Sequence, residues 1–382
     1  MTGQMRAGII GTGFMGEVHA HAVRAAGGVV SEIAGRTPES SRAAAGRLHA
    51  AKAAESPEAL IRSNDVDVVH ICTPNASHVY LARLALEAGK HVVCEKPLAT
   101  TVEDAEQLST LAEGGESVAA VPFIYRFYPT IREAKARLTR GEAGDLWLLH
   151  GSYLQDWLAS SSATNWRVDP GSGGASRAFG DIGVHWCDLM EFVTGHQITR
   201  LIAKTSKAFP QRASESGMLN VGTEDGASLL FETDKGATGS LVVSQVTPGR
   251  KNRLWFSFDG TEASLSFNQE EPDTLWVGSV RGSTRIPSGP DTLSYPESQR
   301  YARLPAGHPH GYQDSFNAFV ADVYAAARGE NVDGLPTFRD GLRAALITQA
   351  VVDSAATDAW VHVPGLQAGS SISDELTPER QR

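Results

Sequence analysis

Short apolar runs alternate with helical stretches along the first third of the chain. Apolar runs that predict buried strands lie at 7–10, 29–34, 66–72, 91–94 and 118–123. The segments that predict helices lie at 17–26, at 79–88 and from near Thr101 onward. Strands that alternate with helices at this spacing are joined by crossovers, which make a sheet mostly parallel. The pattern therefore predicts an α/β unit with a doubly wound sheet and helices on both of its faces.

The pattern changes after about Tyr125. Helices are predicted at 131–138 and 181–193, and between them a strand at 147–157 and a Ser/Gly-rich stretch at 160–174. From Arg200 to Val277 apolar and polar residues alternate with period two, which predicts consecutive antiparallel strands with one open face. Hairpin turns are predicted at 234–236 and 259–260, and two closing helices at 313–328 and 338–356.

These two patterns predict two domains and a tail. We expect a Rossmann dinucleotide-binding domain at 1–125 and a substrate-binding and oligomerisation domain at 126–364. The second domain is α+β, with a large, open and mostly antiparallel sheet. The polar residues 365–382 form a tail. A length of 382 residues fits this division, since one ordinary core seldom serves so long a chain.

Charge and composition narrow the partners. The chain has 34 Lys and Arg against 44 Asp and Glu, a net charge of −10, so nucleic acid and anionic membrane surfaces are disfavoured. No apolar run approaches the roughly 18 residues of a spanning helix. The three cysteines are an odd count, which argues against a disulfide scaffold. With an N-terminus that enters a strand pattern directly, these features predict a cytoplasmic protein.

A glycine-rich loop follows the first predicted strand and opens a helix. Gly11, Gly13 and Gly16, with Phe14 and Met15 between them, form a G-x-G-x-x-G pattern. In this context the glycines permit a tight turn, close approach of a pyrophosphate and close packing of helix on strand. A glycine turn without a ligand is the alternative, and the strand before and helix after disfavour it. We predict a dinucleotide site.

The choice between NAD and NADP stays open. An NAD site usually has a carboxylate at the end of the second strand, where this chain reads Ala-Gly-Arg-Thr at 34–37. Arg36 in that place favours a 2′-phosphate, although an arginine that only stacks on the adenine needs none. We therefore predict NAD(P), with some tolerance of NADP.

Three residues stand out as catalytic candidates. Lys96 follows the strand 91–94 and precedes a proline, which places it at the ligand-binding edge of the sheet. Asp181 and His185 are four residues apart, on one face of the predicted helix. The plainer alternatives are a solvated lysine, a helix-capping aspartate and a core histidine. Asp188, one turn beyond, is expected to orient His185; a metal site from these two residues lacks further ligands, so no metal is predicted.

At this point the sequence resembles the glucose–fructose oxidoreductase, inositol dehydrogenase and MocA-like oxidoreductases over nearly its whole length. Besides the glycine loop, the motifs that carry the resemblance are Thr73-Pro74-Asn75 with His78, Glu95-Lys96-Pro97, Arg126-Phe127-Tyr128-Pro129, the Asp181 to Asp188 stretch and Asp340-Gly341. The resemblance implies that Lys96, Asp181 and His185 surround the reacting hydroxyl. It also implies cofactor contacts from Thr73, Asn75, His78 and Glu95.

Within that family, the segments 151–157 and 165–167 resemble the pyranose-oxidising branch that includes levoglucosan dehydrogenase. Tyr153, Gln155 and Trp157 share one face of an alternating strand. The predicted substrate-binding residues, besides Asp181 and His185, are Arg126, Tyr153, Gln155, Trp157, Trp166 and Arg167. Arg177 is a further candidate for an acidic substituent, and 308–311 for a contribution from the far side. For the tryptophans the alternative is aromatic packing in the sheet.

The motifs predict an NAD(P)-dependent enzyme that moves hydride between the nicotinamide and a secondary hydroxyl, C3 by preference, of a pyranose, glycoside or cyclic polyol. His185 takes the proton, because its ordinary pKa of about 6.5 suits a base near neutral pH. The alternative is a redox-neutral glycosidase that oxidises C3, eliminates the aglycone, adds water and reduces the sugar again, on a uronide or sulfoquinovoside for instance. A third reading is a non-enzymatic NAD(P) sensor. The resemblance implies a homodimer or homotetramer.

Overall fold

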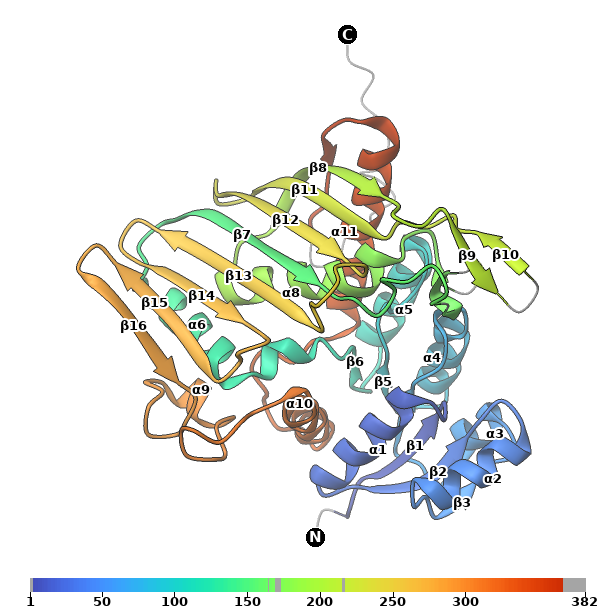
Figure 1. Cartoon of the computed structure of the whole chain (residues 1–382). Coiled ribbons are helices and arrows are strands. Elements are labelled where there is room, and N and C mark those ends of the chain that lie inside the picture. The colour runs from blue at the N-terminus through green and yellow to red at the C-terminus, as the bar shows by residue number, and fades with distance from the viewer. Residues whose placement is uncertain (1–2, 164, 169–172, 215–216, 367–382) are drawn as a thin grey trace.

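The computed structural model describes residues 3–163, 165–168, 173–214 and 217–366. The first unit is a six-stranded parallel sheet in the order β3-β2-β1-β4-β5-β6 (Figure 1). Its strands are β1 (Arg6–Ile10), β2 (Val29–Ala34), β3 (Lys52–Ala53), β4 (Val68–Ile71), β5 (His91–Cys94) and β6 (Ala119–Ala120). The predicted parallel sheet is confirmed, and β3 is a strand that the apolar pattern missed.

Helices connect these strands. They are α1 (Phe14–Ala25), α2 (Pro38–Arg47), α3 (Pro57–Arg62), α4 (His78–Glu87) and α5 (Val102–Glu113), with a 3-10 turn η1 (Asn75–Ser77) before α4. Thr37, Ser56 and Thr101 each accept a backbone N–H three residues on, and the first two precede a proline, so these starts are encoded locally. The helices α2 and α3 were not predicted, because their apolar residues are mostly alanines or too few.

The strand order reverses direction between β1 and β4. From β1 the chain adds β2 and β3 on one side, and β4, β5 and β6 on the other. The crevice at such a switch point, outside the carboxyl ends of the strands, is where ligands bind in open α/β sheets. Here it brings together the segments that follow β1, β4 and β5, which begin at Gly11, Cys72 and Glu95.

The second unit is a nine-stranded sheet in the order β16-β15-β14-β13-β7-β12-β11-β8-β17. Only β7 and β12 pair in parallel, so the expected open, mostly antiparallel sheet is confirmed. The strands are β7 (Leu146–Leu154), β8 (Ile198–Ser206), β11 (Gly226–Thr233), β12 (Thr238–Ser244), β13 (Arg253–Gly260), β14 (Ser264–Asn268), β15 (Thr274–Ser279), β16 (Gly282–Pro287) and β17 (Val361–His362).

The remaining elements cover one face of this sheet or extend from it. Helices α6 (Pro129–Thr139), α8 (Val184–Thr194) and α11 (Phe338–Thr357) pack behind the sheet (Figure 1). A separate hairpin is made by β9 (Gln211–Ser214) and β10 (Gly217–Asn220). The short turns are η2 (Ile124–Phe127), η3 (Trp166–Val168) and η4 (Phe179–Gly183), and α9 spans Pro296–Gln299.

The closing helices connect the two units. Helix α10 (Tyr312–Ala327) packs against α1, and α11 packs against both α5 and β8. The first unit therefore depends on residues from the far end of the chain. Within the described ranges, no helix is long and apolar enough to cross a membrane.

Two local predictions differ from the structure. The strand predicted at 147–157 ends at Leu154. The turn predicted at 259–260 lies instead at 261–263, because β13 runs through Gly260 and β14 begins at Ser264. The turn at 234–236 is confirmed between β11 and β12. Of the predicted tail, residues 367–382 lie outside the described residues.

Candidate active site

A cavity of about 1500 Å³ lies where the two units meet. From the first unit it is lined by the segments that follow β1, β2, β4 and β5. From the second it is lined by the end of β7, the 165–167 segment and the turn η4. One space thus joins the predicted cofactor residues to the predicted substrate residues. Its volume exceeds the several hundred Å³ typical of a small-ligand pocket, as a dinucleotide plus a substrate requires.

The glycine loop has the shape that a pyrophosphate needs. Gly11 has φ of 113°, and a Cβ there would lie 2.5 Å from the Cys72 carbonyl oxygen. A Cβ on Gly16 would lie 2.3 Å from the Gly11 oxygen, whereas one on Gly13 would meet nothing within 4 Å. Gly13 precedes α1 without any side-chain cap, so N–H groups at this helix end stay available. Phe14 and Met15 line the same space, and the loop fits a dinucleotide.

The segment that would face the adenosine ribose has no carboxylate at the end of β2. Arg36, Thr37 and Ser40 line the cavity there, and a Cβ on Gly35 would lie 2.3 Å from the Ser40 hydroxyl. A carboxylate from α3 lines the same cavity: Glu58, which accepts a hydrogen bond from Tyr80. Glu58 was not predicted from the sequence, because it lies outside the usual spacing from the glycine loop.

Lys96 and Asp181 meet across the cavity. The Lys96 ammonium donates to the Asp181 carboxylate at 2.6 Å and to its main-chain oxygen at 2.8 Å. Gln245 donates to the other carboxylate oxygen at 2.7 Å, and the Arg167 Nε lies 3.3 Å from Oδ1. Burial raises the pKa of Asp181, but the charges of Lys96 and Arg167 outweigh it and hold the pKa below its ordinary value. The Lys96–Pro97 bond is cis.

The helix that carries the other two candidates starts irregularly. The predicted α-helix from residue 181 is instead a π turn, η4, followed by α8 from Val184. Such π turns are frequent at functional sites. Asp181 lies in the π turn and His185 in the first turn of α8, and both line the cavity.

His185 is held by aromatic rings. It is 8% exposed and packs edge-on against Phe123 and Tyr125, at 5.7 and 5.2 Å between ring centroids. Its Nδ1 is buried and has no hydrogen-bond partner among the described residues. Burial and the Lys96 charge lower the pKa of His185 well below 6.5. The ring is therefore neutral near pH 7 and free to accept a proton, but it is a weaker base than its ordinary pKa predicts. The expectation that Asp188 orients His185 is wrong, because Asp188 is paired elsewhere.

Arg126 lies away from the cavity, contrary to its predicted role in substrate binding. Its guanidinium binds Asp188 through Nε at 2.9 Å and Asp340 through Nη2 at 2.6 Å, and it stacks over Phe192 at 4.8 Å. The Arg126 and Asp188 side chains are less than a tenth exposed. Arg126 of the Arg126–Pro129 motif therefore forms a structural ion pair. This pair connects the turn η2 to α8 and to the start of α11.

The predicted substrate residues at the end of β7 and just beyond it form one hydrogen-bonded wall. Tyr153 and Gln155 both donate to the Asn252 side-chain oxygen at 2.8 Å, and Trp157 donates to Gln155 at 2.8 Å. Asn252, like Tyr125, lines the cavity but was missed, because nothing in the local sequence indicates that the start of β13 turns toward β7. All three predicted residues line the cavity.

The 165–167 segment also reaches the cavity. Trp166 and Arg167 line it, with the guanidinium 4.3 Å above the indole. Arg177, the other arginine proposed for an acidic substituent, lies elsewhere: it is fully buried and paired with Asp225.

Of the cofactor-binding residues that the resemblance implies, some line the cavity and one lies behind its wall. Thr73, Asn75 and Glu95 line the cavity, and Asn75 also donates to the Gly173 oxygen at 2.9 Å. His78 is fully buried behind them, with its ring nitrogens 2.8 Å from the Pro97 oxygen and 2.9 Å from the Thr73 oxygen. It therefore holds the two loops together and does not line the cavity itself.

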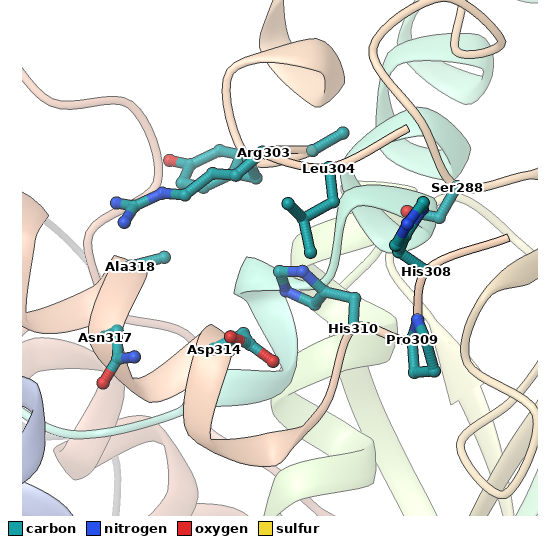
Figure 2. Close-up of a pocket in the computed structure, with 11 residues that line it drawn as sticks. Ser288, Arg303, Leu304, His308, Pro309, His310, Asp314, Asn317 and Ala318 are labelled. Carbon is teal, nitrogen blue, oxygen red and sulfur yellow. The ribbon is translucent and has the colours of Figure 1, made fainter. Parts of the chain in front are cut away.

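The His308–Gly311 segment lines a different, smaller cavity. Figure 2 shows His308, Pro309 and His310 there with Arg303, and with Asp314 from α10. Only the next residue, Tyr312, faces the main cavity. Within the described ranges, no three His, Cys, Asp or Glu side chains converge as metal ligands.

Comparison with known protein families shows which family the chain belongs to. Residues 5–123 match a family model described as an oxidoreductase family with an NAD-binding Rossmann fold. Residues 131–266 match the model of the GFO/IDH/MocA C-terminal domain. The chain belongs to the Gfo/Idh/MocA oxidoreductase family. The resemblance noted in the sequence is thus confirmed, together with the oxidoreductase class and the NAD-type cofactor site.

Several characterised or solved members of this family are similar to the chain along most of its length. Levoglucosan dehydrogenase of Pseudarthrobacter phenanthrenivorans is 33% identical over 95% of this chain and 99% of that protein. A solved structure titled levoglucosan dehydrogenase in complex with NADH and L-sorbose has a TM-score of 0.89 at 32% identity, covering 95% of this chain and 100% of that one. Inositol 2-dehydrogenase 2 of Saccharopolyspora erythraea is 29% identical, covering 98% of this chain and 97% of that one.

The ion pair of Arg126 gives a stability prediction. Replacement by Met leaves two carboxylates without their buried cation, and should lower the free energy of unfolding by about 3–5 kcal/mol in urea denaturation. Arg328→Met is the control, because its pair with Glu330 is partly exposed and should contribute less than about 1 kcal/mol. A stable Arg126 variant with a raised KM for its sugar would instead restore the substrate-binding role.

Proposed function

We propose that the protein is an NAD-dependent dehydrogenase of a secondary hydroxyl, C3 by preference, on a pyranose or a cyclic polyol. The observation that carries the proposal is the convergence of Lys96, Asp181 and His185 in a cavity that also holds a dinucleotide-binding loop. The names of the relatives, which act on levoglucosan and inositol, support a sugar or polyol as the substrate class.

The residues divide the chemistry between them. The nicotinamide, when bound, supplies the redox step by accepting hydride from the carbinol carbon. Lys96 donates a hydrogen bond to the reacting oxygen and stabilises the negative charge that develops on it. His185, whose neutral ring lines the cavity, takes the hydroxyl proton. Asp181 holds the Lys96 ammonium in place and remains ionised to do so.

The aromatic wall suits a sugar. Trp157 and Trp166 lie on the cavity surface, where an indole face can stack on the C–H face of a pyranose. Gln155 and Asn252 offer amide groups for ring hydroxyls. Arg167, stacked on Trp166, still has guanidinium donors beyond its contact with Asp181, so acidic sugars belong in the substrate panel.

The structure gives less support to redox-neutral glycosidase chemistry than to the dehydrogenase reaction. That pathway needs a base for the C2 proton, and Tyr153 is a candidate because it lines the cavity. Burial and the neighbouring Tyr125 raise the pKa of Tyr153 well above 10, which makes its phenolate hard to form. His185 would then have to serve both proton transfers.

Nucleotide choice rests on Arg36. Its position on the cavity wall, with Thr37 and Ser40 beside it, supports some tolerance of a 2′-phosphate alongside NAD. Comparing NAD with NADP in the assay below tests this directly.

We also propose a homodimer or homotetramer formed through the uncovered face of the large sheet. Leu230, Val242 and Trp276 point to that face from three strands, and are 54%, 46% and 36% exposed. Exposed apolar side chains on an uncovered sheet face favour a subunit contact. Light scattering should give twice or four times the mass of one chain, and a stable monomer would contradict the proposal.

Single substitutions test the catalytic assignment. Lys96→Ala and His185→Ala should each reduce kcat by at least about 100-fold, because each removes help with the proton or the developing charge. Binding of NADH, followed by fluorescence, should persist in both. Lys251→Ala and His308→Ala are matched controls outside the cavity, and near-normal turnover of either first variant would remove that residue from the mechanism.

A paired assay separates the dehydrogenase from the glycosidase. Neutral and acidic nitrophenyl and alkyl pyranosides are incubated with NAD or NADP, and the reduced nucleotide and free aglycone are followed in the same sample. The proposal predicts reduced nucleotide in step with keto sugar and no aglycone. Release of aglycone over many turnovers without net reduced nucleotide would establish the glycosidase instead.

A further inference from the structure

A chain of buried polar side chains leads from the cofactor cavity into the first unit. His19 on α1 contacts Glu95 through Nε2 at 3.0 Å and His70 on β4 through Nδ1 at 2.9 Å. The other nitrogen of His70 lies 3.1 Å from the Tyr324 hydroxyl on α10. Each of the four residues is at most 6% exposed. These hydrogen bonds between buried side chains are not explained by the glycine loop or by the cluster of Lys96, Asp181 and His185.

The hydrogen-bond pattern has a direction if Glu95 is ionised. A carboxylate only accepts, so His19 donates from Nε2. In a neutral imidazole the other nitrogen then accepts, so His70 donates from Nδ1 and accepts at Nε2 from the Tyr324 hydroxyl. Every donor in the chain then has an acceptor, with both histidines neutral. Burial and the neighbouring His19 lower the pKa of His70 well below 6.5, in agreement with a neutral ring.

Glu95 is the end of the chain that reaches the cavity. It follows β5 directly, lines the cavity beside Lys96, and takes the Lys96 backbone N–H on its second oxygen at 3.2 Å. The Lys96 ammonium is bound to Asp181 and so does not pair with Glu95. A nicotinamide that takes hydride from the carbon whose hydroxyl Lys96 holds would lie in this part of the cavity.

We propose that His19 and His70 are positioning residues that keep Glu95 ionised and fixed beside the nicotinamide, so that the site favours the oxidised nucleotide. The nicotinamide ring is positively charged only when oxidised, and a fixed carboxylate in a poorly solvated wall attracts that form selectively. A protonated, cationic His19 would cancel the charge, so the protonation state of the chain decides the effect. The inference rests on the dinucleotide site and not on the identity of the sugar.

The first experiment compares dissociation constants of NAD⁺ and NADH by titration calorimetry, with no sugar present. Glu95→Gln should reduce the preference for NAD⁺ over NADH, relative to wild type, by at least about tenfold. His19→Leu should shift the ratio in the same direction. His19→Gln, whose amide can still donate to Glu95, should restore most of the preference. His21→Leu is the matched control, an exposed histidine on the same helix that contacts Asn317 instead.

The second experiment determines the protonation states of His19 and His70 in the wild-type protein. With ¹⁵N-labelled histidine, NMR should find His19 neutral and protonated on Nε2, and His70 neutral and protonated on Nδ1, throughout pH 6 to 8. His19→Gln and His70→Gln variants assign the signals. A doubly protonated His19, an unchanged ratio in Glu95→Gln, or an unchanged ratio in His19→Leu would each overturn the proposal. An error in the proposed sugar would alter none of these readouts.

Discussion

The contact between Lys96 and Asp181 is the interaction on which the site depends. Lys96 belongs to the parallel sheet and Asp181 to the π turn of the second unit, so their 2.6 Å contact joins the cofactor half of the cavity to the substrate half. The ammonium needs this partner, because an unpaired charge in so buried a position is costly. In the proposed function, a sugar hydroxyl that enters the cavity meets a cation that is already held in place.

The surroundings explain how the remaining charges can be buried there. Gln245 and Arg167 satisfy the rest of the Asp181 carboxylate, and His185 stays neutral between aromatic rings. Arg126 and His78 keep the supporting loops in place without entering the cavity. The residues of the family motifs thus serve two purposes: some face the ligands, and others fix the segments that carry them.

Much of this was predictable from the chain alone. That Lys96, Asp181 and His185 lie in one cavity could be predicted, because strand ends, a proline and a four-residue spacing are local signals. The contacts of Arg126 and Arg177 could not be predicted. The partner of Arg126, Asp340, lies 214 residues away, and the partner of Arg177, Asp225, lies 48 residues away. Asn252 was missed for the same reason: its role comes from the pairing of β13 with β7. Sequence indicates which residues carry chemistry better than which of them meet.

Hydride transfer from a sugar carbon to the nicotinamide is the central claim, and isotope transfer tests it most directly. The protein is incubated with NAD⁺ and a panel of pyranosides deuterated at C3, and the reduced nucleotide is analysed by mass spectrometry and NMR. The account predicts one deuterium at C4 of the nicotinamide in the nucleotide formed. Reduced nucleotide that carries no deuterium would contradict oxidation at C3, and no reduction with any substrate of the panel would contradict the dehydrogenase itself.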